Sequence, residues 1–214
     1  AFTSIWTSTE LDLTRSVAWG DWDGDGDPDL VAGNEGVPSR LYDNDGTGTM
    51  SLVWSSDETS QTQGAAWADQ DGDGALDLGL ANVGANRVHA NSAGSLAVGW
   101  ESAETDASRA VAWGDMDGDG DLDLAVGNFV PGGGAPNRVY ENTPTGLQLY
   151  WTSVESEPTF GIAWGDWNGD GLLDLAAGNY QTGSRVYQNS GSGFASAWVG
   201  TLNTPTRAIE WADW

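Results

Sequence analysis

Four nearly identical segments recur along this 214-residue chain, and they constrain its fold more than any other feature. Each has the form A-W-x-D-x-[DN]-G-D-G-x-x-D-L-x-x-x-N. The first loop aspartates are Asp21, Asp69, Asp115 and Asp166, which are 48, 46 and 51 residues apart. A fifth copy opens near the C-terminus, where Asp213 lies 47 residues after Asp166. A fixed period of this length predicts an array of like structural units.

Each unit contains four short β-prone stretches separated by turn residues, and no stretch has a helical period. The first stretch ends in Ala-Trp, as in Val17–Trp19, and an aspartate-rich turn and an apolar run such as Leu30–Ala32 follow it. The third stretch begins with arginine, at Arg40, Arg87, Arg138 and Arg185. The fourth contains tryptophan, at Trp54, Trp100, Trp151 and Trp198. Four strands in roughly 45 residues are typical of a β-propeller blade.

We therefore predict a single all-β domain over residues 1–214, a propeller or partial propeller built of four-stranded blades. The four complete repeats span approximately 15–56, 63–102, 109–153 and 160–200. Residues 1–10, with Trp6, are expected to form the last strand of a preceding blade. Residues 206–214 are expected to form the first strand of a following blade. On this interpretation the chain is a fragment of a larger propeller, either natural or trimmed by design.

Oxygen-bearing side chains at alternate positions of each aspartate-rich turn predict a calcium site. Such a loop suits a hard cation that takes six to eight oxygen ligands at about 2.3–2.6 Å. The seventh position varies between acid and hydrocarbon, so we expect it to donate its backbone carbonyl. The predicted ligand positions are Asp21, Asp23, Asp25, Asp27 and Asp29; Asp69, Asp71, Asp73, Ala75 and Asp77; Asp115, Asp117, Asp119, Asp121 and Asp123; and Asp166, Asn168, Asp170, Leu172 and Asp174.

The charge balance supports bound cations. The chain has 32 acidic residues against 7 basic ones, and 17 of the acids lie in the four turns. Two carboxylates about 4 Å apart repel by roughly 4 kcal/mol at an effective dielectric constant of about 20. We therefore expect about one Ca²⁺ per complete repeat, four in all. With four ions the net charge would change from −25 to about −17, which still argues against nucleic acid or an anionic membrane as partner.

The calcium turn, followed in three repeats by D-L-x-x-G-N, resembles the FG-GAP/VCBS class of repeats found in integrin α-subunit propellers and in many secreted proteins. The resemblance covers essentially the whole chain. It implies a propeller with calcium between the two inner strands of each blade, a role in adhesion or in ligand or sugar binding, and a secreted or cell-surface location. Only Phe160-Gly161 matches the Phe-Gly of the class, so an integrin-like partner is not implied.

The expected function is that of a non-catalytic binding or assembly module. Exposed strand edges favour pairing with another chain, so we expect self-association, with a dimer closing a ring of roughly eight blades. A monomer that closes with four or five blades is the alternative. A calcium-dependent carbohydrate-binding (lectin or adhesion) module is the alternative function, with a glycan or protein as ligand. A hydrolase or lyase is a remote alternative, because cysteine and lysine are absent and the single histidine, His89, occupies a tyrosine position.

Residues that recur with the blade are interpreted mainly as packing residues. The strand tryptophans are expected to pack between blades, with sugar stacking as the alternative for the fourth strand. The third-strand arginines are expected to pair with acids. The second position of the turn varies, since the second repeat has Gln70 there, and such variation suits an exposed site. The candidate ligand contacts are therefore Trp22, Met116 and Trp167.

Overall fold

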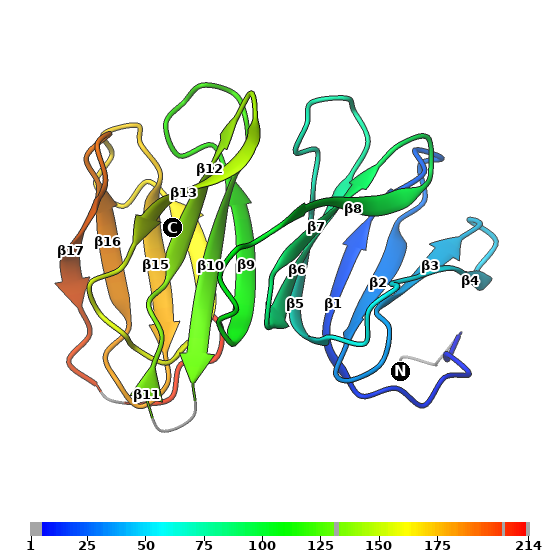
Figure 1. Ribbon diagram of the computed structural model, residues 1–214, viewed down its shortest axis with the longest axis horizontal. Helices are drawn as coiled ribbons and strands as arrows, with labels where there is room; N and C mark the ends of the chain where they lie inside the picture. Colours follow the sequence, from blue (N-terminus) through cyan, green and yellow to red (C-terminus); the bar gives the residue numbers. More distant parts are fainter. Residues whose placement is uncertain (1–5, 131–132, 203, 213–214) are drawn as a thin grey trace.

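The computed structural model describes residues 6–130, 133–202 and 204–212. Within these ranges the chain contains no helix, and its strands β1 to β17 form four antiparallel sheets (Figure 1). Each sheet uses one sequence repeat, and its four main strands lie in chain order. The all-β fold with four-stranded blades is confirmed.

The first two blades are regular four-stranded sheets. The first contains β1 (Thr14–Gly20), β2 (Asp29–Asn34), β3 (Arg40–Asn44) and β4 (Met50–Ser55). The second contains β5 (Gln61–Ala68), β6 (Asp77–Val83), β7 (Arg87–Asn91) and β8 (Leu96–Glu101).

The third blade carries an additional short strand. It contains β9 (Ser108–Gly114), β10 (Asp123–Val130), β12 (Arg138–Thr143) and β13 (Gly146–Thr152), and β11 (Gly133–Gly134) pairs with the end of β10. The fourth blade is again regular, with β14 (Thr159–Gly165), β15 (Asp174–Asn179), β16 (Arg185–Asn189) and β17 (Phe194–Val199).

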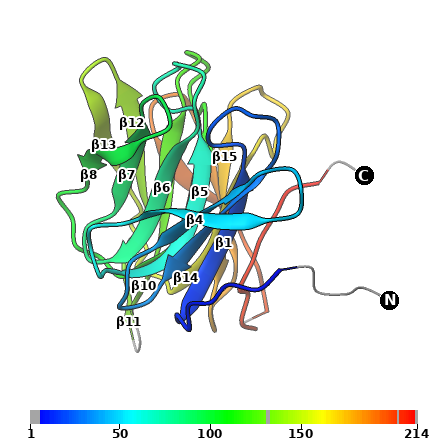
Figure 2. The same cartoon turned by 90° about the vertical axis from the view of Figure 1, so that its right-hand side faces the viewer.

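The inner strands place the blades side by side. β1 contacts β5, β5 contacts β9, and β9 contacts β14. Among the described strands no comparable contact joins β14 to β1, so the four blades form an arc that runs from blue to orange in Figure 1. In the view turned by 90°, the first and last described segments, blue and red, lie on the same side (Figure 2).

The hydrophobic core is divided among the boundaries between blades. One cluster joins Val31 and Leu41 of the first blade to Leu78, Leu80 and Leu96 of the second. The two other clusters lie at the second and third boundaries in the same way. Because each blade buries its apolar face against the next one, a blade depends on its neighbour for stability.

The segment before β1 occupies the place of a fourth strand. The Trp6 ring meets the Tyr42 ring edge to face at 5.0 Å, as Trp100 meets Tyr140 at 5.0 Å. The Tyr42 hydroxyl donates to Glu10 over 3.1 Å, and the Tyr140 hydroxyl donates to Glu104 over 2.9 Å. Residues 1–5 of this predicted strand lie outside the described residues.

The segment after β17 occupies the place of a first strand. The Trp211 indole donates to the Ala163 carbonyl over 3.2 Å, as Trp164 donates to Ala112 over 3.1 Å. However, the described parts of the two end segments form no β-ladder, so their prediction as strands is wrong in this respect. The physical reason is that a ladder needs a neighbouring strand, and neither segment has its own blade beside it. Asp213 and Trp214 lie outside the described residues.

Candidate metal sites

The aspartate-rich turns connect the first and second strand of each blade. In the first turn, Gly24 and Gly26 have φ values of 77° and 97°, in the left-handed region that glycine tolerates best. The Asp21 carboxylate accepts hydrogen bonds from the amides of both glycines, at 3.0 and 3.1 Å. The turn therefore wraps around its own first side chain, and the same pair of positive-φ glycines recurs in the other three turns.

Three carboxylates converge in each of the first three turns. The first, third and ninth positions offer oxygen atoms that all lie within 4.8 Å of one another. These groups are Asp21, Asp23 and Asp29; Asp69, Asp71 and Asp77; and Asp115, Asp117 and Asp123. The structure thus brings together three of the predicted ligand positions, the first, third and ninth, in each of these three turns.

The fifth and seventh positions are not part of these triads. In the first turn the Asp25 carboxylate instead accepts a hydrogen bond from the Asp27 amide over 2.9 Å. The second and third turns repeat this bond from the amides of Ala75 and Asp121, and in the fourth turn it comes from Leu172. Position five therefore shapes the turn in this structure, whereas positions one, three and nine form the oxygen cluster.

The fourth turn replaces the middle aspartate with Asn168. Asp166 accepts hydrogen bonds from the amides of Gly169 and Gly171, at 2.7 and 3.0 Å, so this turn has the same wrap. The Asn168 amide group donates to Asp170 over 2.9 Å. The fourth turn can therefore offer an amide oxygen at its third position, with one carboxylate fewer than the other turns.

The ninth-position aspartates are buried, with Asp29, Asp77 and Asp174 at 0% and Asp123 at 1% exposure. Each accepts two backbone hydrogen bonds, which for Asp29 come from Trp22 at 2.9 Å and Asn44 at 2.8 Å. Burial raises the pKa of Asp123 to about 6, and the nearby Asp117 and Asp119 charges add to the rise. Burial also raises the pKa values of Asp29 and Asp77. A cation in the turn would offset both the burial and the repulsion.

The second turn position packs toward the next blade. The carbonyls of Trp22, Gln70 and Met116 accept hydrogen bonds from asparagine side chains of the following blade, at 2.7, 2.7 and 2.8 Å. Met116 is only 2% exposed and belongs to a core cluster. Its prediction as a ligand contact is therefore wrong, because the neighbouring blade covers this position. Trp22 is half-buried and packs in the same way.

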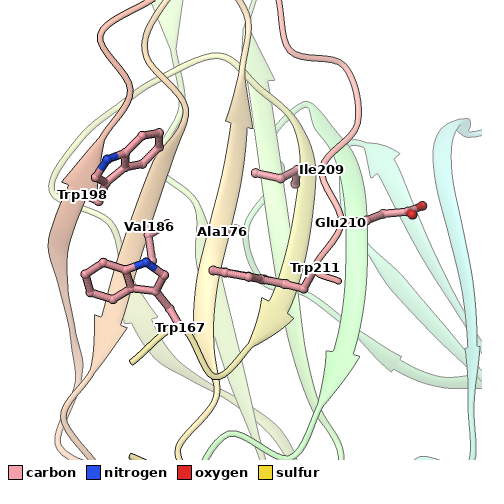
Figure 3. Close-up of a pocket in the computed structure, with 7 residues that line it drawn as sticks. All are labelled: Trp167, Ala176, Val186, Trp198, Ile209, Glu210 and Trp211. Atoms are coloured by element: carbon pink, nitrogen blue, oxygen red, sulfur yellow. The ribbon is translucent and has the colours of Figure 1, made fainter. Parts of the chain in front are cut away.

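Trp167 differs because no further blade follows it in the described residues. It is 45% exposed and lines a pocket of about 240 Å³ with Ala176, Val186, Trp198 and the terminal Ile209 and Trp211 (Figure 3). At the first boundary the corresponding side chains pack against Leu78, Leu80 and Leu96. The pocket is therefore the open half of a blade–blade interface, which explains its apolar lining.

The third-strand arginines pair with acids, as predicted. Arg138 lies 2.6 Å from Asp106, and Arg185 lies 2.8 Å from Glu157. Arg40 pairs with Asp12, and Arg87 pairs with Glu58 and Glu101. The packing role of the first three fourth-strand tryptophans is also confirmed, since Trp100 and Trp151 donate to the carbonyls of Leu147 and Phe194 in the next blade and Trp54 packs in the first core cluster.

His89 is a packing residue, as expected from its tyrosine position. It is 2% exposed, and its ring meets Trp54 at 5.1 Å. Its Nε2 lies 3.7 Å from Glu58. Burial lowers the pKa of His89, so the neutral imidazole is favoured.

A family model for the FG-GAP-like repeat matches residues 21–80 and 71–126. The chain contains FG-GAP-like repeats. These matched residues contain the first three aspartate-rich turns, and the fourth turn repeats the same motif beyond them. Compared with curated protein sequences, the chain matches none.

A solved structure supports the fold of these FG-GAP-like repeats. A chain of the "Crystal Structure of Mitotic Checkpoint Complex", a WD40 propeller, matches with a TM-score of 0.62 and 15% sequence identity. The match covers 84% of the present chain and 53% of that one, so the present chain spans about half of its length. At this identity the similarity shows β-propeller blades and nothing of function. The described residues also include no helix long and apolar enough to cross a membrane.

One group of residues that meet in the structure was not predicted from the sequence. This group lies near the start of β14, at the opposite ends of the inner strands from the aspartate-rich turns. It contains Phe129, Phe160 and Tyr180 together with Arg109 and Arg207. The sequence feature that could have indicated this group is the variation between repeats at these positions. Phe129 and Tyr180 follow the conserved asparagine, where the first two repeats have Glu35 and Val83.

Proposed function

We propose that the chain is a calcium-stabilised, non-catalytic binding module of an extracellular protein. The observation that carries this proposal is the aspartate triad with oxygens within 4.8 Å, present in three successive turns. Three carboxylates at this separation repel one another strongly without a counter-ion. Their oxygen-only chemistry and wrapped loop favour calcium over softer metals. Extracellular fluids hold calcium at concentrations that fill even weak sites.

A count of bound ions tests this proposal. Native mass spectrometry in calcium should give four Ca²⁺ per chain, and Asp117→Ala should reduce the count to three. Asp57→Ala, which removes an exposed acid outside the turns, is the control and should keep four. A chain that binds no calcium, or a D117A variant that still binds four ions, would contradict the proposal.

A non-catalytic role is supported by the chemistry of the side chains. The sequence has no cysteine or lysine, and its single histidine is buried against Trp54. Most of the clustered aspartates lie in the turns, where their oxygens accept hydrogen bonds from backbone amides or form the proposed metal sites. General acid–base or nucleophilic catalysis needs a reactive group within reach of a substrate.

Assembly is a second candidate role, and the uncovered blade faces favour it. On the first blade Val17 and Trp19 are 57% and 59% exposed, whereas Trp164 at the matching position is half-buried. The fourth blade presents the complementary apolar pocket beside Trp167. We propose that a second copy of the chain supplies the missing neighbour. Light scattering in calcium should then give twice the chain mass, and a monomer at high concentration would contradict this role.

A further inference from the structure

The blades are so alike that their differences mark candidate binding sites. An insertion in the third blade is the largest difference. The Asn128 amide bonds to the side chain of Asn137, nine residues ahead, whereas the matching bond in the second blade joins Asn82 to Asn86. The additional residues carry β11, which Figures 1 and 2 place at the bottom of the molecule. This edge is opposite the aspartate-rich turns, because those turns join the other ends of the inner strands.

Aromatic residues that the first two blades lack gather beside this insertion. The ring of Phe160 lies 4.6 Å from Phe129 and 5.3 Å from Tyr180, and Phe129 lies 6.3 Å from Tyr180. All three rings are half-buried. At the Phe160 position the first two repeats have Arg15 and Gln63. The cluster is therefore specific to the boundary between the third and fourth blades.

Two arginines cover the aromatic cluster. The guanidinium carbon of Arg109 lies 5.0 Å from the Phe129 ring centre and 5.6 Å from that of Phe160. Arg207 lies 5.3 Å from Phe160 and 5.6 Å from Tyr180. Cations at these distances over ring faces are held in place by the rings. Their charges are therefore positioned beside the aromatic surface.

These two arginines have no carboxylate partner among the described residues, whereas the other five arginines form ion pairs. Arg109 donates to the Gln63 side chain, but its Nε is buried and has no acceptor. Burial lowers the pKa of Arg109, and the pKa values of the carboxylate-paired Arg40, Arg87, Arg138 and Arg185 are raised. Glu35 attracts Arg109 electrostatically, but no described carboxylate lies within ion-pair distance of either arginine, although the net charge of the chain is −25.

A pocket of about 540 Å³ opens next to the cluster, and Phe129 and Tyr180 form part of its wall. This volume is in the range of small-molecule sites, about 300–1,000 Å³. None of the described residues that line it is acidic. The Thr182 hydroxyl oxygen at its edge is buried without a partner. Gln181, also in the wall, has a φ of 62°, a left-handed conformation that is uncommon outside glycine and that concentrates at functional sites.

We propose that this pocket, together with the two arginines stacked on its wall residues Phe129 and Tyr180, binds an acidic carbohydrate, a glycan that carries uronate carboxylates. The inference rests on the proposed function as a binding module and specifies its ligand class. Arginine favours carboxylates because its planar donors match the two oxygens. Aromatic rings offer an apolar surface for the C–H face of a sugar, and Thr182 and Gln181 offer hydrogen bonds to its hydroxyl groups.

Isothermal titration tests the proposal with trigalacturonic acid and its fully methyl-esterified form, at one calcium concentration in cell and syringe. The ester has the same shape without the negative charges. We expect it to bind at least ten-fold more weakly. Arg207→Gln should weaken binding of the acid at least ten-fold, since Arg207 is exposed and its loss should not disturb the fold. Arg15→Gln is the matched control, because Arg15 occupies the same repeat position but pairs with Glu35.

Equal binding of the two trimers, full binding by R207Q, or no binding at millimolar concentration would overturn the proposal. Melting curves of the same proteins with and without chelator separate it from the calcium proposal. If calcium raises the melting temperature but no trimer binds, the uronate site is wrong and the calcium proposal stands. If the acid binds selectively but chelator leaves melting unchanged, the calcium proposal fails and the uronate site stands.

Discussion

The indole Nε1 of Trp164 donates a hydrogen bond to the carbonyl oxygen of Ala112 over 3.1 Å, and this bond joins the fourth blade to the third. The ring also lies against Gly114 of the third blade, where a Cβ atom would come within 2.7 Å of it. At the second boundary Trp113 donates the same bond to the Ala66 carbonyl over 3.4 Å, and at the first boundary Trp67 lies against Gly20 while its Nε1 has no hydrogen-bond partner. The contact is repeated by Trp211 and Gly165.

Replacing this tryptophan should be costly only where a neighbouring blade covers it. Trp164→Ala should lower the free energy of unfolding by about 3 kcal/mol, the lower end for a buried Trp→Ala change, because the ring is half-buried. At protein concentrations that keep the chain monomeric, Trp19→Ala should cost less than about 1 kcal/mol, because Trp19 is 59% exposed in the single chain. Urea unfolding in calcium provides the comparison. Equal losses at the two positions would show that neighbour packing does not decide the cost.

Removal of calcium should destabilise the fold. At a free calcium concentration about 100 times the dissociation constant, each site would stabilise the folded state by about 2.7 kcal/mol. Excess EDTA should therefore lower the melting temperature, and recalcification should restore it. Magnesium should restore it less, because it prefers octahedral geometry and keeps its waters. An unchanged melting curve in EDTA would contradict calcium stabilisation.

The fourth turn should bind calcium most weakly, because Asn168 stands where the other turns have aspartate. Ligand charge is one of the factors that set calcium affinity. Asn168→Asp should tighten the fourth site by about ten-fold, or about 1.4 kcal/mol. Chelator titration followed by native mass spectrometry should show the fourth ion leaving first from the natural chain. In the variant, the first and the last calcium ion should leave at more similar chelator concentrations. A titration identical to that of the natural chain would refute this ranking.

His89 should make stability depend on pH in the weakly acidic range. Burial lowers its pKa below the ordinary value of 6.5, and Arg87 adds to this while Glu58 opposes it. The folded state thus binds the proton less readily than the unfolded state, so this contribution to stability is present above pH 6.5 and is lost as pH falls.

His89→Tyr, which restores the residue of the other repeats, tests this dependence. The difference in unfolding free energy between the variant and the natural chain should grow as pH falls below 6.5, by at most about 1.4 kcal/mol per pH unit. Chemical denaturation at several pH values in calcium measures it. A constant difference between pH 5 and 8 would show that His89 does not titrate differently in the two states.

Much of the fold could be predicted because it is local. The strands and turns of each blade follow from alternation, glycine placement and the Ala-Trp and Asp-Leu boundaries, which repeat four times. The converging carboxylates of the aspartate-rich turns were predictable for the same reason, since positions one, three and nine lie within nine residues of sequence. The turn also has glycines at the two places where φ must be positive, such as Gly24 and Gly26.

The less predictable features all depend on neighbouring blades. Met116 and Trp167 occupy equivalent positions of the repeat, yet Met116 is 2% exposed and Trp167 is 45% exposed. The fourth blade covers Met116, whereas no described blade covers Trp167. Likewise, Trp19 and Trp164 belong to the same position but differ in burial for the same reason.

By itself the sequence determined the period, the four-stranded blade and the oxygen-rich turn, because each is written in residues close together along the chain. Only the tertiary structure decided which faces are covered and which residues from different blades meet. Arg109, Phe129 and Phe160 are 20 to 51 residues apart in sequence, yet their side chains stack at one boundary. Their contact arises because adjacent inner strands place the variable ends of successive blades side by side.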